Sequence, residues 1–210
     1  MTTLEITIDG ISEGQRIPEK FAFGVRTEDA PFAFGPNISP AMTWSAGPAG
    51  TKSYAIIMHD RSVPTVFDDA NQEGRTIPAD LARMDFMHWI LIDIPATNTS
   101  LTEGAESDSV VPKGKPTGSS EHGTRGANDF GMFMASNPDM AGDYGGYDGP
   151  APPWNDALMH EYVFTVFALD TDSLALNGVF SGAEALAAME GRVLASGQVV
   201  ATYTLNPDLM

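Results

Sequence analysis

The amino-acid sequence predicts a mainly β protein with an antiparallel core and one peripheral helix near the C-terminus. Two observations support this class: strand-like segments follow one another along most of the chain, and only one later segment carries a helix-start signal. In several of these segments apolar and polar residues alternate, because successive side chains of a strand point to opposite faces of a sheet. Strands followed by a late helix are typical of a β core that a helix covers on one side.

Seven segments are predicted to be strands. Three of them are predominantly apolar and are expected to be the central strands, at residues 53–60, 86–94 and 160–170. The other four are residues 4–8, a short irregular strand within 21–29, and residues 42–45 and 198–205. The alternation in residues 4–8 predicts an edge or outer strand with one exposed face.

The helix is predicted to begin at Ser181. Ser181 and Glu184 have the spacing of a capping box, in which each side chain hydrogen-bonds the backbone of the other residue. The buried stripe of this helix is expected to comprise Leu186, Met189 and Val193. Gly197 stands where a glycine usually follows a helix C-terminus.

Composition limits both the architecture and the partners. We expect residues 1–210 to form one domain, because no Ser-, Gly- or Pro-rich linker separates two apolar segments. The formal net charge is −17, with 11 Lys and Arg against 28 Asp and Glu. Such a charge disfavours nucleic acid and anionic lipid surfaces, which bind clustered Lys and Arg. No run approaches about 18 apolar residues, so no integral membrane segment is expected.

The cysteine count and the N-terminus bear on location. The chain has no cysteine, which excludes disulfides and thiol catalysis. Residues 1–10 are acidic and strand-like, so no signal peptide is expected. We therefore expect a cytoplasmic location, and a periplasmic one stays open because a leader could have been removed.

Two of the predicted central strands carry a histidine among apolar residues. The period of two places His88 on one face with Phe86, Ile90, Ile92 and Ile94, and His160 with Tyr162, Phe164, Val166 and Ala168. A buried polar ring needs a hydrogen-bond partner or a ligand. If these strands are neighbours, the two rings would form a pocket.

The order of these segments resembles the phosphatidylethanolamine-binding protein family, and most closely its bacterial Raf-kinase-inhibitor-like branch. The resemblance covers roughly residues 5–205 and rests on an ordered set of short motifs. These are residues 37–40 (NISP), 48–53 (PAGTKS), 88–89 (HW), 128–131 (NDFG), 146–149 (GYDG) and 160–166 (HEYVFTV).

The resemblance implies a two-sheet antiparallel β-sandwich with a small cavity that binds phosphate, phosphoryl head groups and similar anions. The residues that it places around the cavity are Asp60, Pro64, His88, Gly149, His160 and Tyr162. Imidazole and phenol groups can donate hydrogen bonds to an oxyanion, and glycine lets backbone N–H groups approach it. A carboxylate repels phosphate, so Asp60 is expected to orient a histidine, to hold it protonated, or to receive the amine of a head group.

We interpret the protein as a binding module without catalytic residues, metal or cofactor. Its expected ligand is phosphate-like or a phosphorylated small molecule, and a kinase or protease partner is implied by the resemblance only. The alternative is a metal-dependent or acid–base enzyme that uses Asp60, His88 and His160. A carboxylate with two imidazoles is the ligand set of many non-haem iron and zinc sites.

Two features differ from the bacterial relatives. The first is the turn Asp60-Arg61-Ser62-Val63-Pro64, where relatives typically show Asp-Pro-Asp-Ala-Pro, and it leaves open whether Arg61 faces the cavity or solvent. The second is a pair of longer loops, residues 65–85 and 132–144. Long loops in compact proteins are often functional or mobile. We expect them to form a lid or side wall at the pocket, with residues 68–74 solvated and mobile.

Overall fold

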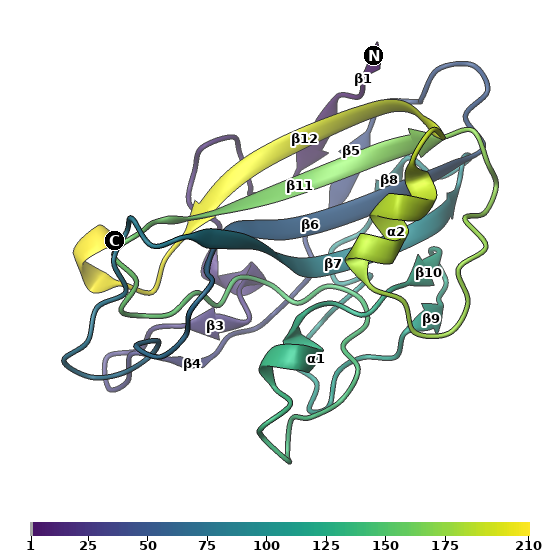
Figure 1. Ribbon diagram of the computed structural model, residues 1–210. Coiled ribbons are helices and arrows are strands. Elements are labelled where there is room, and N and C mark those ends of the chain that lie inside the picture. Colours follow the sequence, from purple (N-terminus) through teal and green to yellow (C-terminus); the bar gives the residue numbers. More distant parts are fainter. Residues whose placement is uncertain (1) are drawn as a thin grey trace.

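The computed structural model describes residues 2–210, and a seven-stranded sheet runs through the whole molecule (Figure 1). The strand order is β1-β12-β11-β6-β7-β10-β9. The strands are β1 (Thr2–Thr3), β6 (Ser53–Pro64), β7 (Arg83–Pro95), β9 (Gly118–Ser119), β10 (Thr124–Arg125), β11 (His160–Leu169) and β12 (Val193–Tyr203). All neighbours are antiparallel except β1, which runs parallel to β12.

Smaller elements cover both faces of this sheet. The other strands are β2 (Ile6–Ile8), β5 (Met42–Trp44) and β8 (Ser100–Leu101) in a three-stranded sheet, and β3 (Gly24–Val25) and β4 (Ala33–Phe34) in a ribbon. The helices are α1 (Phe130–Phe133) and α2 (Gly182–Met189), with 3-10 turns at Glu19–Phe21 and Pro207–Leu209. Helix α2 lies on the opposite face from β5 (Figure 1). The predicted antiparallel sandwich with a peripheral helix is therefore confirmed.

The central strand β6 is apolar on both faces because both faces are covered. Ile56 and Met58 pack against the small sheet, in the cluster that contains Trp44. Ala55 and Ile57 alternate with them and pack beneath α2. A strand that is buried on both sides needs apolar residues at every position, which explains the continuous apolar run in the sequence.

A β-bulge at His88 changes the predicted faces of β7. Met58 of β6 pairs with Trp89, whereas the next residue of β6, His59, pairs with Met87, so His88 is the additional residue on β7. A bulge of this kind shifts which residues share a face. The prediction that His88 shares a face with Ile90 and Ile92 was therefore wrong, because those two pack beneath α2. Phe86 and His88 both line the same pocket, as expected.

Helix α2 begins as predicted but ends early. The Ser181 side chain accepts from the Glu184 N–H, and the Glu184 side chain accepts in return, which completes the capping box. The helix stops at Met189, and residues 193–203 are strand β12 instead. Gly197 is not a helix cap: a Cβ there would collide with the carbonyl oxygen of Leu4, whose chain crosses β12. Of the predicted stripe, Met189 is buried.

Candidate ligand pocket

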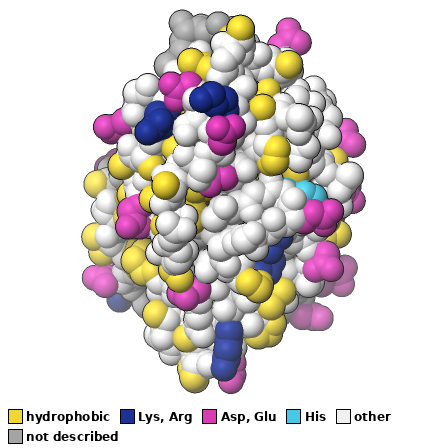
Figure 2. All heavy atoms as spheres, turned by 90° about the vertical axis from the view of Figure 1, so that its right-hand side faces the viewer, with side chains coloured by type: hydrophobic (Ala, Val, Ile, Leu, Met, Phe, Trp, Pro, Cys, Tyr) yellow, Lys and Arg dark blue, Asp and Glu magenta, His cyan; other side chains and the backbone are white. Residues whose placement is uncertain are grey.

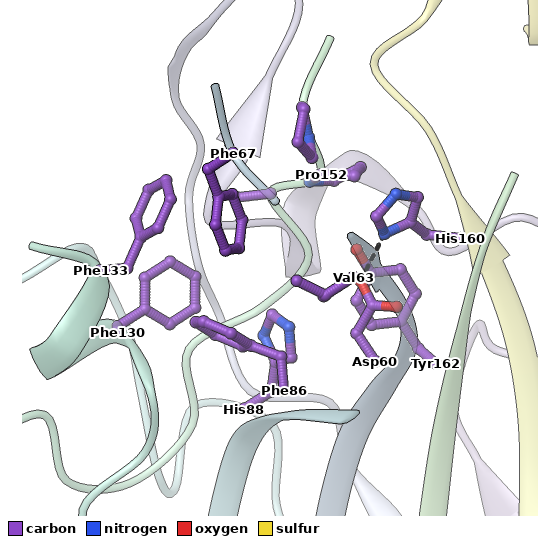
Figure 3. A pocket seen from close by; sticks show the side chains of 12 residues that line it. Asp60, Val63, Phe67, Phe86, His88, Phe130, Phe133, Pro152, His160 and Tyr162 are labelled. Carbon is purple, nitrogen blue, oxygen red and sulfur yellow. Dashed lines mark hydrogen bonds and ion pairs between the residues drawn. The ribbon is translucent and has the colours of Figure 1, made fainter. Parts of the chain in front are cut away.

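A small pocket lies where β11, β6 and β7 meet beneath two loops. Tyr162, Asp60 and Phe86 are direct neighbours across these three strands. The lining comprises Asp60, Val63, Phe67, Phe86, His88, Phe130, Phe133, Ala151, Pro152, Pro153, His160 and Tyr162. In Figure 3 the phenyl rings lie on one side, and Asp60 and His160 lie on the other. The cavity volume is about 30 Å³, which is room for a few water molecules at most.

His160 is held between two carboxylates. Its Nδ1 donates to Asp60 Oδ2 at 2.6 Å, and its Nε2 donates to Asp156 Oδ2 at 3.1 Å. Burial favours the neutral ring, but the Asp60 charge and the two hydrogen bonds outweigh it and raise the pKa of His160 to about 9. At pH 7 the ring is therefore an imidazolium whose two N–H groups are both used inside the protein.

Asp156 joins this pair to the long loop before β7. Arg83 forms a two-point ion pair with it, at 2.6 Å to Oδ2 and 3.0 Å to Oδ1. Asp156 is fully buried, and burial alone would raise its pKa, but the hydrogen bonds from His160 and Arg83 lower it. The row Arg83–Asp156–His160–Asp60 therefore alternates in charge and leaves no buried charge unpaired.

His88 has the opposite charge state. Burial lowers the pKa of His88 to about 4, so the ring is neutral at pH 7. Its Nδ1 lies 2.7 Å from the carbonyl oxygen of Asp148. A carbonyl only accepts, so Nδ1 carries the proton, and Nε2 is the acceptor nitrogen of the neutral ring.

The Asp148 segment that orients His88 is itself fixed by a buried network. The Asp148 carboxylate accepts from Lys115 Nζ at 2.6 Å, and from the side-chain amides of Asn37 and Asn128 at 2.8 Å each. Asp148 is fully buried, and its backbone N–H also donates to the His88 carbonyl oxygen. Lys115 and the amides thereby position the carbonyl that sets the His88 tautomer.

Tyr162 supplies the one open donor that faces Asp60 and His88. Its hydroxyl is buried beside the Asp60 carboxylate, and among residues 2–210 it makes no hydrogen bond of good geometry. Burial, with the Asp60 charge nearby, raises the pKa of Tyr162 well above its ordinary value, so the hydroxyl keeps its proton. The ring centroids of His88 and Tyr162 are 5.3 Å apart. We call these two side chains the polar floor of the pocket. The Tyr162 hydroxyl offers a hydrogen-bond donor, and the His88 ring beside it offers an acceptor.

Two of the six predicted pocket residues do not line the pocket. Pro64 is buried at the end of β6, opposite Arg83, and Val63 faces the pocket instead. The Gly149 N–H is already used, because it donates to Asn37 Oδ1 at 2.8 Å. Gly149 is needed for packing, since a Cβ there would collide with the carbonyl oxygen of Phe21.

The unusual turn after Asp60 keeps its local hydrogen bonding. The Ser62 N–H donates to Asp60 Oδ1 at 2.8 Å, and the Ser62 hydroxyl accepts from the Glu161 N–H. Arg61 faces solvent and pairs with Glu161 at 2.7 Å, with about half of its side chain exposed. Of the two orientations left open for Arg61, the structure shows the solvent-facing one.

Four phenylalanines form the apolar side of the pocket, and we call them the aromatic collar: Phe67, Phe86, Phe130 and Phe133. Phe67 lies in the loop after β6 and Phe133 is the last residue of α1, and their ring centroids are 6.3 Å apart. Phe86 and Phe130 are buried and meet edge to face at 5.4 Å. The loop after β6 and helix α1 therefore meet at the pocket, and each contributes a ring to its wall.

The middle of the first loop is exposed, yet its backbone is held firmly. The Asn155 side chain donates to three backbone carbonyl oxygens, those of Asp69, Gln72 and Arg75, and accepts from the Asn71 N–H. Asn155 is itself buried. The structure thus ties residues 69–75 to the segment before β11, whereas the sequence led us to expect a mobile stretch.

Sequence reasoning missed the residues that set the two charge states. Asp156 stands four residues before His160 but outside any helix, so this spacing gave no signal of a second carboxylate. Phe130 lies within the NDFG motif, which was recognised without a role for its ring. Arg83 and Phe67 carry no local signal, because their positions depend on how the long loop folds back.

The described residues show few other candidate sites. Nowhere in residues 2–210 do three His, Asp or Glu side chains converge as a metal site would need. Within the same residues, no helix has the length and apolarity to cross a membrane. Acidic side chains are spread over the face in Figure 2 and outnumber the basic ones there.

Comparisons with known proteins agree with the fold and the motifs. Residues 7–204 match the family model described as phosphatidylethanolamine-binding protein. YbcL of Escherichia coli, a UPF0098 protein, is 28% identical, with 96% of this chain and 88% of YbcL covered. A UPF0098 protein of Aquifex aeolicus is 30% identical, with 91% of each chain covered.

A solved structure supports the same relationship. The crystal structure of Escherichia coli YbcL, described as a new member of the mammalian PEBP family, has a TM-score of 0.68 and 26% identity to this chain. The match covers 97% of this chain and 99% of YbcL. The chain therefore belongs to the phosphatidylethanolamine-binding protein family, as its ordered motifs predicted.

Proposed function

We propose that the pocket binds a small molecule through a phosphoryl or carboxyl group that carries a proton. The supporting observation is a pair of polar groups in the pocket lining: the Tyr162 hydroxyl, which makes no hydrogen bond of good geometry among residues 2–210, and the neutral His88 ring. A protonated acid group offers both complements, since one oxygen accepts from Tyr162 while its O–H donates to His88 Nε2.

The charge around the pocket favours such a ligand over a fully ionised one. Both N–H groups of His160 are used by carboxylates, so this imidazolium offers no direct hydrogen bond to an anion. A dianion would meet the Asp60 carboxylate and a His88 nitrogen that only accepts. Binding is therefore coupled to proton uptake, whether the proton resides on the ligand or on His88.

Calorimetry with O-phosphorylethanolamine and inorganic phosphate tests the proposal. Tyr162→Phe removes only the hydroxyl and should weaken binding by about tenfold or more, because a hydrogen bond to a charged group contributes roughly 1.5–3 kcal/mol. His88→Ala should have a similar effect. Tyr203→Phe is the matched control, since the Tyr203 hydroxyl donates to the Gly24 carbonyl oxygen outside the pocket. Unchanged affinity in both pocket variants, or a wild type that binds no such acid, would contradict the proposal.

Proton uptake gives a second readout of the same proposal. The second pKa of a phosphate monoester is about 6, so the protonated form becomes scarce above that pH. Affinity should then fall by up to about tenfold for each further pH unit. An affinity that is constant between pH 6 and pH 8 would argue for an ordinary anion site.

A further inference from the structure

The mouth of the pocket carries an unusual share of the protein's exposed apolar side chains. Nine large hydrophobic residues are exposed in the described part of the chain, and four of them belong to the two segments that carry Phe67 and Phe133, the loop after β6 and helix α1. These are Val66, Phe67, Met132 and Phe133, with exposed fractions of 49%, 37%, 66% and 46%. Exposed apolar side chains that gather at one place mark a binding surface more often than scattered ones do.

Two of these side chains line the same cavity as the polar floor. Phe67 and Phe133 belong to the aromatic collar, which lines the same cavity as His88 and Tyr162 (Figure 3). The Phe133 ring stands edge to face with Phe86 at 6.5 Å, and the Phe86 ring lies 5.1 Å from the His88 ring. A group that binds at His88 therefore lies directly beside the collar rings.

The collar also limits the space that is available. A cavity that accepts benzene has a volume of about 150 Å³, whereas this pocket has about 30 Å³. Phe86 and Phe130 are buried and fixed by packing, but Phe67, in the loop after β6, and Phe133, at the C-terminal end of α1, are partly exposed. These two rings are the ones that can rotate to make room for a ligand. After rotation they would still line the cavity and contact the ligand.

We infer that the ligand carries a compact aromatic group next to its acid group, and that Phe67 and Phe133 select it. An inserted ring meets phenyl edges and faces, which is the arrangement that aromatic pairs prefer. It also covers the two exposed rings, which removes apolar surface from water. That the aromatic group belongs to an acid ligand rests on the proposed function. That the collar binds an aromatic ring at all does not depend on it.

The test compares two phosphate esters that differ only in the apolar group. Two aromatic contacts of ordinary strength correspond to about tenfold in affinity, so phenyl phosphate should bind at least about tenfold more tightly than methyl phosphate. In the double variant Phe67→Ala/Phe133→Ala the ratio of the two affinities should fall close to one. The control is Phe34→Ala, which removes an exposed phenyl ring outside the pocket and should keep the preference.

A neutral probe separates the two proposals. Benzyl alcohol should shift the NMR signals of the Phe67 and Phe133 rings in the wild type. If it does so while neither ester binds, the affinity of the collar for an aromatic ring stands, whereas the acid-binding proposal and the selection that rests on it fail. Equal affinity for the two esters, or a preference that survives the double variant, overturns the collar inference and leaves the proposed function intact. Failure of benzyl alcohol and both esters to bind overturns both.

Discussion

His88 and His160 face one pocket from two strands that flank β6, yet they differ in charge. His160 lies between two carboxylates and is an imidazolium, whereas His88 donates to a backbone carbonyl and is neutral. Burial acts against the charged form of both rings, so the difference comes from their partners. The same residue in a similar strand pattern thus serves two purposes: His160 completes a fixed ionic row, and His88 leaves an acceptor open for a ligand.

The largest expected effect comes from removing the charge that joins the ionic row. Asp156→Asn should lower the free energy of unfolding by about 3–5 kcal/mol, because it leaves the charges on Arg83 and His160 without their shared partner. Denaturant unfolding at pH 7 measures the loss. The matched control is Asp170→Asn, whose pair with Arg192 is exposed, and its change should stay within about 0.5 kcal/mol. A loss for Asp156→Asn no larger than the control's would show that the row is not a stabilising unit.

The second effect is a pH dependence of the free energy of unfolding that His160 causes. The folded-state pKa of about 9 exceeds the ordinary value of 6.5, so this stabilisation is fully present below pH 6.5 and is lost as pH rises through 9. At about 1.4 kcal/mol per pKa unit, the loss is about 3 kcal/mol. His160→Gln should be less stable at pH 7 and should lack this particular slope. Parallel pH profiles for the wild type and the variant would contradict the assignment.

His88 should give the opposite slope on the acid side. Its folded-state pKa of about 4 lies below 6.5, so the unfolded chain takes up a proton first as pH falls. Stability should therefore decrease between pH 6.5 and pH 4, and His88→Gln should remove that component. A wild-type profile that matches the variant over this range would indicate that His88 is protonated in the folded protein.

A smaller, local effect is expected where Asn155 holds the first loop. Asn155→Ala removes all four of its hydrogen bonds to residues 69–75, and a buried group that loses its partner costs about 1–3 kcal/mol. Hydrogen exchange of the backbone N–H groups in residues 69–75 should become faster. Asn177→Ala removes one exposed hydrogen bond and is the control. Unchanged exchange in Asn155→Ala would mean that the loop is held by other contacts.

Much of the fold follows from the sequence because strand patterns are local. The apolar runs of β6, β7 and β11 and the capping box of α2 were identified from neighbouring residues alone. The face of His88 was partly mispredicted, because a bulge depends on pairing with another strand and has no local signal. The helix end was misplaced for the same reason, since Gly197 is required by the crossing of Leu4.

The pocket was only partly predictable. Asp60, His88, His160 and Tyr162 meet as the family motifs implied. Their protonation states were not predictable, because Asp156 and the Asp148 carbonyl become partners only after folding. The collar rings of Phe67 and Phe133 come from a long loop and from the four-residue helix α1, which are too irregular or too short for a period or a cap to indicate which side chains turn inward.

The smallest expected effect concerns the cation beside Asp60. Arg61→Ala should change stability by less than about 0.5 kcal/mol, because its pair with Glu161 is exposed. Affinity for O-phosphorylethanolamine should also be unchanged, since Arg61 faces away from the pocket lining. Calorimetry and denaturant unfolding check both points, and a clear loss of affinity would place Arg61 within the binding site.

The contrast between the two histidines can be measured directly by an NMR titration of their ring nitrogens. We predict that His160 shows two protonated nitrogens at pH 7 and loses a proton only near pH 9. We predict that His88 carries its proton on Nδ1 alone and stays neutral down to about pH 4. Two rings that both titrate near the ordinary pKa of about 6.5 would contradict the opposite charge states, and with them the proton-linked binding proposed for the pocket.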